Sequence, residues 1–346
     1  MYEVKRLFYK GIGKLSCLSF LFPFFSFLFF ILSANTTAAQ PVSHGGAQKI
    51  GLVLGGGGAK GGAEVGVLKV LEEEGIRPDI IVGTSIGSII GGLYAAGYSA
   101  KELEQMFTQQ EWLSLLTDRR ADLVNEPYKK IGGILYIFGF PVFDADNMSF
   151  GVLNGLQVEM TVDSMLRKKG CTNFECQKIP FSCVAARLMQ AEEVVLDKGP
   201  MPKAIRASMA IPGIFKPVEI NGEKLVDGGM MNNLPVDVAR KMGADMVIAI
   251  DLQQTKQEKR QQADSFLTGI ADAVGLGPIV RWIFSRPDID KYYENRKNCD
   301  IYINPPLPDA DASSFGNNNM RRMISIGEKE ARKQLPRLRQ LTHKTN

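Results

Sequence analysis

The chain has 346 residues, of which 45% are hydrophobic and 23% are charged. This composition is ordinary for one large or two smaller globular domains and excludes an intrinsically disordered chain. The 41 basic and 37 acidic residues give a net charge of +4, but four basic residues and one acidic residue lie in the first 39 positions. The remainder has 37 against 36, a net charge of +1, so nothing in the charge balance favours a nucleic-acid partner.

The first 39 residues have the pattern of a secretory signal peptide. Four basic residues precede an apolar run, and small residues ending at Ala39 follow it. The alternative is a retained membrane anchor. The apolar run from Cys17 to Leu32 has 16 residues and contains Pro23, whereas a spanning helix needs about 20. We therefore expect residues 1–39 to be removed and the protein to be exported, as a periplasmic, outer-membrane-associated or secreted protein.

Export would also determine whether the cysteines can form disulfides. Export would place Cys171, Cys176, Cys183 and Cys299 in a compartment that permits disulfides. Cys171 and Cys176 are near enough in sequence to pair, but free buried thiols account for them equally well, and the sequence leaves both alternatives open. A zinc site would need further close cysteine pairs or histidine partners. No metal and no other cofactor is expected.

From Lys49 onward, the sequence predicts alternating strands and helices. A strand at 49–54 leads into a helix at 61–75, and a strand at 79–83 leads into a helix at 85–97. Two strands joined by a helix form a βαβ unit, which predicts an α/β fold with a parallel sheet covered on both faces. Further strands are predicted over residues 181–188, 193–197, 223–229 and 245–251.

Two segments lack a regular period. Residues 131–156 are rich in glycine and aromatic side chains, which predicts an irregular cap or insertion. The apolar side chains from Ile131 to Phe150, such as Phe138 and Phe140, would line an acyl groove, face a bilayer or pack in an ordinary core. The polar run at 253–265 predicts a surface loop or boundary, and the rest of the chain predicts helices, a strand at 299–306 and a basic final helix.

The glycines after the first strand suggest an anion site. Gly56, Gly58 and Gly61 fit G-x-G-x-x-G, the spacing that receives a dinucleotide pyrophosphate. Bare amides at a helix start would bind the oxyanion of an acyl transfer equally well. A nucleotide site needs an acidic residue at the end of the second strand, but Asp79 lies at its start. The strand end decides between the two.

That strand end is a G-x-S-x-G sequence at residues 83–87, with Ser85 at its centre. Flanking glycines permit a sharp turn that raises a serine to the top of a sheet, although a small-residue turn without chemistry has the same pattern. Adjacent parallel strands would bring the amides of Gly56 to Gly61 beside Ser85. The two loops together therefore predict a nucleophile and an oxyanion hole at one sheet edge.

A serine nucleophile needs a base, and the chain has only two histidines. His44 follows the expected cleavage site and His343 is four residues from the end, so neither is expected to be held rigidly. A carboxylate is the better candidate. Asp227 follows a predicted strand and precedes Gly228 and Gly229, which place it in a tight turn, although such turns are common without chemistry.

Four segments of the chain resemble the patatin-like phospholipase family over roughly residues 48–252: GGGGAKG, GTSIG, RASMAIPGIFKPV and VDGGMMNNLPVDVARKMGAD. The resemblance implies a three-layer α/β/α fold and a Ser-Asp dyad, here Ser85 and Asp227. It also implies an oxyanion loop, here Gly56, Gly57, Gly58 and Lys60. Residues 253–346 would then be a helical extension packed on this catalytic domain, and residues 313–335 resemble a segment of exported family members that are joined to an outer-membrane barrel.

The function that the resemblance implies is hydrolysis of phospholipids, lysophospholipids or other lipid esters at a membrane surface, without metal or nucleotide. The alternatives are a catalytically silent lipid-binding protein with the same fold and a nucleotide-binding α/β enzyme. Head-group specificity and homodimer formation stay open.

Some positions depart from the family pattern, and others match it. Glu64 stands where many relatives have histidine, and VAARL at 184–188 replaces the more usual VATDL. Both changes would alter the polarity of the pocket. Four matching residues are interpreted as packing and turn supports, not as catalysts: Arg206, Ser208, Pro212 and Asn232.

Overall fold

The computed structural model divides into two units, residues 1–45 and residues 46–346. The structure describes the following ranges: 48–110, 112–116, 121–123, 125–131, 134–137, 140–144, 153–187, 190–212, 214–254, 288–307 and 315–342. The expected signal peptide, both histidines and most of the polar run at 253–265 lie outside the described residues. The limits of the expected domains stay a prediction.

The second unit is built on an eight-stranded sheet with the order β11-β10-β1-β2-β6-β9-β8, in which β7 also pairs with β6. Its strands are β1 (Ile50–Leu54), β2 (Ile80–Thr84), β6 (Phe181–Arg187), β7 (Glu192–Leu196), β8 (Val218–Ile220), β9 (Glu223–Asp227), β10 (Met246–Ile250) and β11 (Ile301–Ile303). The five strands from β11 to β6 are parallel, whereas β7, β8 and β9 run antiparallel to their neighbours. The predicted α/β class with a mostly parallel sheet is confirmed.

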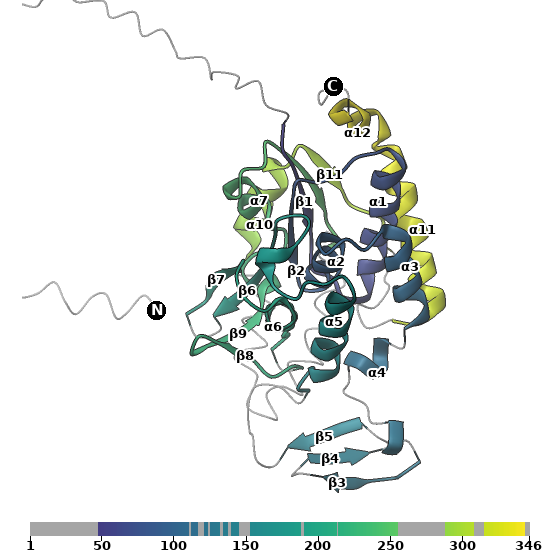
Figure 1. Cartoon of the computed structure of the whole chain (residues 1–346), viewed down its shortest axis with the longest axis vertical. Coiled ribbons are helices and arrows are strands. Elements are labelled where there is room, and N and C mark those ends of the chain that lie inside the picture. Colours follow the sequence, from purple (N-terminus) through teal and green to yellow (C-terminus); the bar gives the residue numbers. More distant parts are fainter. Residues whose placement is uncertain are drawn as a thin grey trace, which may run out of the picture. The chain divides into compact units, whose positions relative to one another are not determined.

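The central strands are buried on both faces. Every residue of β1 and β2 is buried, as expected for parallel strands that helices cover on both sides. Within β1, Leu52 and Leu54 pack into one hydrophobic cluster and Val53 into another, because successive side chains point to opposite faces. Figure 1 shows α1, α3 and α11 on one side of the sheet and α7 and α10 on the other, which gives three layers.

The helices are α1 (Gly62–Glu73), α2 (Ile86–Ala95), α3 (Ala100–Gln109), α4 (Trp112–Leu116), α5 (Leu156–Lys168), α6 (Met201–Ser208), α7 (Val236–Lys241), α10 (Ile289–Asn298), α11 (Asn317–Lys333) and α12 (Leu335–Thr342), with short 3-10 turns η2 (Gly58–Gly61), η3 (Ala121–Leu123), η4 (Phe174–Cys176) and η5 (Gly228–Met230). Helix α11 lies against α1 at backbone contact. A Cβ on Gly66 would clash with the carbonyl of Ile324, and one on Gly327 with that of Ala63. These glycines let α11 pack directly on α1.

Residues 129–144 differ from the expected irregular cap. The described residues of this range form a separate antiparallel sheet of three strands, β3 (Lys129–Ile131), β4 (Ile134–Ile137) and β5 (Phe140–Asp144). The sequence contains one turn signal for it, the Gly132-Gly133 pair between the segments of β3 and β4. Phe138 lies outside the described residues, as does the side chain of Phe140, so the role proposed for them stays a prediction.

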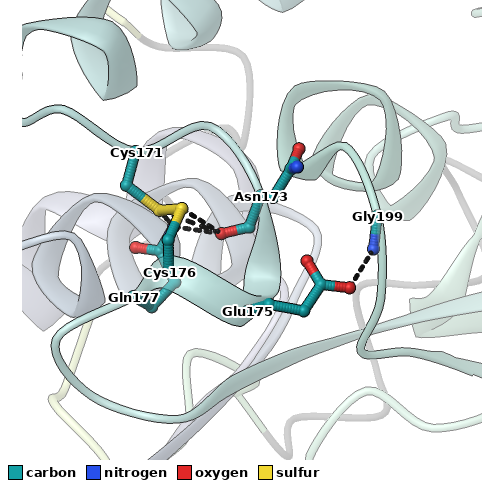
Figure 2. The surroundings of a disulfide bond; sticks show 6 residues. All are labelled: Cys171, Asn173, Glu175, Cys176, Gln177 and Gly199. Carbon is teal, nitrogen blue, oxygen red and sulfur yellow. Dashed lines mark hydrogen bonds between the residues drawn. A yellow bond between two sulfur atoms is a disulfide. The ribbon is translucent and has the colours of Figure 1, made fainter.

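A disulfide joins Cys171 to Cys176, with Cα atoms 5.7 Å apart, which decides between the two alternatives left by the sequence. Figure 2 shows that the bond closes the turn around η4. The side chain of Gln177 donates to the Asn173 carbonyl at 2.7 Å, and Glu175 accepts from the Gly199 amide at 2.9 Å.

Along the described ranges, no helix combines the length and apolar content that a membrane span requires.

Candidate active site

Ser85 lies in a strained turn between β2 and α2. Its backbone has φ 55° and ψ −121°, a positive φ that non-glycine residues seldom adopt. Glycine is required on both sides, since a Cβ on Gly83 would clash with the Gly87 carbonyl and one on Gly87 with the Leu54 carbonyl. The turn places a serine at the carboxyl end of a buried strand and at the N-terminus of a helix.

Strand pairing brings Asp227 to the same point. In β6, Val184 lies opposite Thr84, the last residue of β2, and the next residue, Ala185, lies opposite Asp227, the last residue of β9. Strands β2 and β9 therefore end beside consecutive residues of β6. The Oγ of Ser85 donates a hydrogen bond to Oδ2 of Asp227 at 2.8 Å.

Asp227 is a buried carboxyl group with two donors. Its side chain is 6% exposed, and its Oδ1 accepts from the Gly229 amide at 2.7 Å. Burial raises the pKa of Asp227 from 3.8 to about 6, because desolvation disfavours the charged form more than the bonds from Gly229 and Ser85 favour it. An acid with this pKa is ionised near neutral pH yet binds a proton more readily than an exposed aspartate does.

Neighbouring hydroxyl groups hold the backbone of Ser85. Its amide donates to Oγ of Ser208 at 3.0 Å, and the Ser208 hydroxyl donates to the Val184 carbonyl at 2.6 Å. The Ser88 hydroxyl donates to the Ser85 carbonyl at 2.6 Å. The turn is thus tied to β6 and to the first turn of α2.

The glycine loop lies beside Ser85. A Cβ placed on Gly56 would be 3.2 Å from the Cβ of Ser85. Asn233 engages both polar groups of Gly56, because its carbonyl accepts from the Gly56 amide at 3.3 Å and its Nδ2 donates to the Gly56 carbonyl at 3.1 Å. The Gly56 amide therefore already donates a hydrogen bond and is not available to an oxyanion.

The other predicted oxyanion-loop residues, Gly57, Gly58 and Lys60, differ in whether their backbone amides already donate a hydrogen bond. The Lys60 amide donates to the Gly57 carbonyl at 3.3 Å inside η2. Within the described residues, the amides of Gly57 and Gly58 donate to no backbone or side-chain acceptor. Gly58 has φ 58°, a conformation that suits glycine. Of the four residues, Gly57 and Gly58 have amides available to an incoming oxyanion.

Glu64, in the first turn of α1, is a second buried carboxyl group near this loop. It is 0% exposed, and neither of its oxygens has a hydrogen-bond partner among the residues that the structure describes. Burial raises its pKa well above the ordinary value. The nearby Gly55 amide, whose own hydrogen bond is to the Ile250 carbonyl, partly offsets the effect of burial, and the charge of Asp251 raises the pKa further.

Arg206, which the sequence suggests is a packing support, is buried and joins two separate segments. Arg206 is 1% exposed and donates to the Asn154 carbonyl at 2.9 and 2.6 Å and to the Lys216 carbonyl at 3.1 Å, which joins the start of α5 to the loop after α6. Sequence reasoning missed Asn233, although two asparagines shortly after an Asp-Gly-Gly turn are a visible sign of backbone capping. Within the described parts of the chain, no three His, Cys, Asp or Glu side chains are grouped to hold a metal ion.

The fold and site define an α/β/α protein with a serine and a carboxylate paired at the end of its parallel sheet. The sequence profile of the patatin-like phospholipase family matches residues 52–240, more than half of the chain. The chain belongs to the patatin-like phospholipase family.

Curated relatives also match more than half of the chain. An NTE family protein of Mycobacterium tuberculosis is 31% identical over 231 residues, which are 67% of this chain and 56% of the relative. Patatin-like phospholipase domain-containing protein 6 of Homo sapiens is 36% identical over 205 residues, and Lysophospholipase NTE1 of Candida albicans is 32% identical over 205 residues. Each of these two alignments covers 59% of this chain and 13% of the relative. The chain thus spans 56% or less of the length of these relatives.

Solved structures with low sequence identity also align with the chain. VipD from Legionella pneumophila aligns with 14% identity and a TM-score of 0.37, covering 82% of this chain and 67% of that one. The type III effector protein ExoU aligns with 15% identity and a TM-score of 0.43, covering 84% of this chain and 53% of that one.

Proposed function

We propose that the chain is a serine acyl hydrolase that cleaves ester bonds of phospholipids or lysophospholipids through a dyad of Ser85 and Asp227. The observation that carries this proposal is the 2.8 Å hydrogen bond from Ser85 Oγ to a buried Asp227 carboxylate, in a turn with positive φ. Membership of the patatin-like phospholipase family supports the lipid substrate class, as do relatives named phospholipase and lysophospholipase.

The chemistry follows from these groups. Ionised Asp227 accepts the Ser85 hydroxyl proton while Oγ forms a bond to the ester carbonyl carbon. The amides of Gly57 and Gly58 donate to the oxyanion that develops. The C–O bond to the alcohol then breaks, and Asp227 returns the proton to the leaving oxygen. Water attacks the acyl-serine with Asp227 again as base, which releases the fatty acid and restores Ser85.

A membrane surface is the proposed partner, since exposed apolar side chains lie next to the site. Ile211 and Ile214 are 39% and 47% exposed, and Leu156 and Met160 on α5 are 54% and 57% exposed. The two segments are joined by the Leu153 amide, which donates to the Ile214 carbonyl at 3.0 Å. The first segment directly follows Ala210, whose carbonyl accepts from the Asp227 amide at 2.9 Å. An apolar surface beside the catalytic aspartate suits a substrate that is presented in a bilayer.

We also propose that the protein is exported and related to the barrel-linked family members. The leader pattern of residues 1–39 and the disulfide of Cys171 and Cys176 support export, because disulfides persist in oxidising compartments. Sequencing the N-terminus of the protein from its native host tests this. A mature chain that begins at Gln40 is expected, and an intact Met1 in a membrane fraction would instead identify an anchor.

Two measurements test the hydrolase. A fluorophosphonate probe should label the wild type at Ser85 and leave Ser85→Ala unlabelled. Vesicles of phosphatidylcholine and micelles of lysophosphatidylcholine should release fatty acid with the wild type only. Lipid binding without labelling or release would instead identify a silent lipid-binding protein. Replacing Ile211 and Ile214 by serine should reduce hydrolysis of vesicles more than hydrolysis of a soluble short-chain ester, if the apolar surface meets the bilayer.

A further inference from the structure

The short turn after η5 contacts each part of the candidate site. The Asn232 amide donates to the Gly228 carbonyl at 2.9 Å, which closes the turn that begins at Asp227. The Asn232 carbonyl accepts from the Thr84 hydroxyl at 3.0 Å, one residue before the nucleophile. The next residue, Asn233, holds both polar groups of Gly56. The position of Asn232 therefore affects the base, the nucleophile and the oxyanion loop together.

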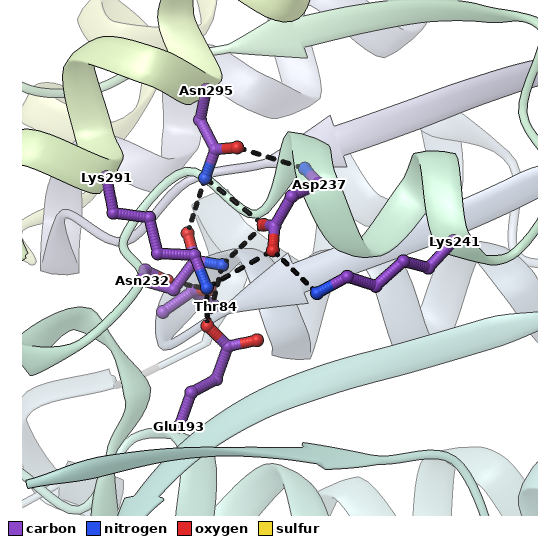
Figure 3. A network of polar contacts seen from close by, with 7 residues as sticks. All are labelled: Thr84, Glu193, Asn232, Asp237, Lys241, Lys291 and Asn295. Atoms are coloured by element: carbon purple, nitrogen blue, oxygen red, sulfur yellow. Dashed lines mark hydrogen bonds and ion pairs between the residues drawn. The ribbon is translucent and has the colours of Figure 1, made fainter. Parts of the chain in front are cut away.

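The side chain of Asn232 is held by groups from three separate elements. It is 1% exposed, and its Nδ2 donates to Glu193 of β7 at 3.0 Å and to Asp237 of α7 at 2.8 Å. Its Oδ1 accepts from Nδ2 of Asn295 on α10 at 3.0 Å. Asn295 is itself 1% exposed, donates to Asp237 at 3.2 Å and accepts from the Asp237 amide at 3.1 Å. Figure 3 shows Asn232 at the centre of this network.

Two carboxylates meet at Asn232, and a lysine of α10 balances them. The ammonium of Lys291 contacts Glu193 and lies 3.1 Å from Asp237, while Lys241 lies 3.1 Å from Asp237 on the solvent side. Burial works against the charge of Lys291, but the two carboxylates outweigh it and raise the pKa of this lysine. Without Lys291, Glu193 and Asp237 would repel each other across the amide that both accept from.

Helix α10 lies beyond the part of the chain that matches the family, which ends at residue 240. We propose that α10 completes the active site from behind, with Asn295 and Lys291 as positioning residues that fix Asn232 and, through it, Ser85, Asp227 and Gly56. This inference rests on the proposed hydrolase activity. Loosening Asn232 would disturb the reacting geometry and leave the substrate-binding surface intact, so the effect falls on kcat and not on KM.

The test uses the full chain with a soluble short-chain p-nitrophenyl ester and with the fluorophosphonate probe. Asn295→Ala should lower kcat and the labelling rate of Ser85 by about 10-fold or more with KM unchanged, since displacements of about 1 Å cost up to 10²-fold. Lys291→Met should lower kcat by a smaller factor, and Lys291→Arg, which keeps the charge, should restore it. Lys297→Met, on an exposed position of the same helix, is the matched control and should behave as the wild type.

The outcomes separate the two proposals. A wild type that neither labels nor hydrolyses overturns the hydrolase and this inference with it. A wild type that is active, with Asn295→Ala and both Lys291 variants equal to it in kcat and labelling rate, overturns the role of α10 alone. Lys291 is partly exposed, so Lys291→Met and Lys291→Arg keep the question answerable if Asn295→Ala does not fold. A fall in activity shared by Lys297→Met would likewise count against a specific network.

Discussion

Asp227 and Glu64 are two buried carboxyl groups near the glycine loop, and they differ in what surrounds them. Asp227 accepts hydrogen bonds from Ser85 and Gly229, which partly offset its desolvation and leave its pKa at about 6. Glu64 has no such donor among the described residues, and burial moves its pKa well above the ordinary value. Burial without such donors raises the pKa of a carboxyl group further, whereas burial with two donors produces a group that exchanges a proton near neutral pH.

The largest expected effect separates the two carboxyl groups by activity. Asp227→Asn keeps the shape of the side chain but removes the base, and should lower kcat by about 10⁴-fold. Glu64→Gln should leave kcat within about a factor of three, because Glu64 holds no reacting atom. Ester hydrolysis under saturating substrate measures both. The dyad is wrong if Asp227→Asn stays active while a double variant, His44→Ala with His343→Ala, is inactive.

The dependence of kcat/KM on pH should also distinguish Asp227 from Glu64. Asp227 must be ionised to accept the Ser85 proton, so kcat/KM should fall as the pH falls through about 6, with a tenfold loss per pH unit below that value. The profile of Glu64→Gln should keep this acidic limb unchanged. Initial rates from pH 4.5 to 8 with a soluble ester provide the measurement, and an acidic limb that moved with Glu64→Gln would assign the titration to the wrong carboxyl group.

Asp227→Asn, which lowers activity, should raise the free energy of unfolding at neutral pH. Raising the pKa of Asp227 from 3.8 to about 6 destabilises the folded wild type by about 3 kcal/mol at pH 7, because the folded state binds the proton more tightly than the unfolded state. The wild type therefore loses this stability as the pH rises from about 4 to about 6. Asp227→Asn does not titrate and should gain up to this amount in free energy of unfolding above pH 6. Urea unfolding at pH 4 and pH 7 measures the difference, and equal gains at both pH values would contradict it.

The last prediction concerns the stability effect of Glu64, whose replacement has the smallest expected effect on activity. Its folded pKa lies above its unfolded value, so the stability of the wild type should fall as the pH rises past the unfolded pKa, by at most about 1.4 kcal/mol per pH unit. Glu64→Gln should remove this slope while the protein stays folded. Thermal unfolding of both proteins between pH 5 and pH 8 shows the slope directly, and parallel curves would mean that Glu64 is ionised in the folded protein.

Local sequence predicted the fold and the residues of the candidate dyad, for physical reasons. Continuous apolar runs such as β1 and β2 have few alternatives to a buried parallel sheet, and a serine between Gly83 and Gly87 has few alternatives to a sharp turn. What the sequence did not predict depends on distant neighbours. That the Gly56 amide is taken by Asn233 follows from a contact across 177 residues, and no local pattern encodes it.

Other features that the sequence does not predict also depend on contacts between residues distant in sequence. The predicted effect of Glu64 on pocket polarity stays a prediction, while its complete burial depends on the packing around α1, which no local pattern encodes. Asn295 lies in a polar helix whose sequence predicts only a solvated surface, and its amide is buried because α7 and Asn232 meet it. The sheet of β3, β4 and β5 is hard to predict for a simpler reason, since Lys129 and Lys130 leave its first strand without an apolar pattern beside the Gly132-Gly133 turn signal.

The end-to-end meeting of β2 and β9 beside β6 has a consequence for how the protein is made. Ser85 and Asp227 are 142 residues apart in sequence, and their contact depends on β6, which pairs with β2 and, over its last residues, with β9. Such a long-range contact forms late in folding, because the loop closure must precede the pairing. During synthesis from the N-terminus, Ser85 therefore enters the chain 142 residues before Asp227, and the proposed dyad does not exist until both β6 and β9 are present and paired.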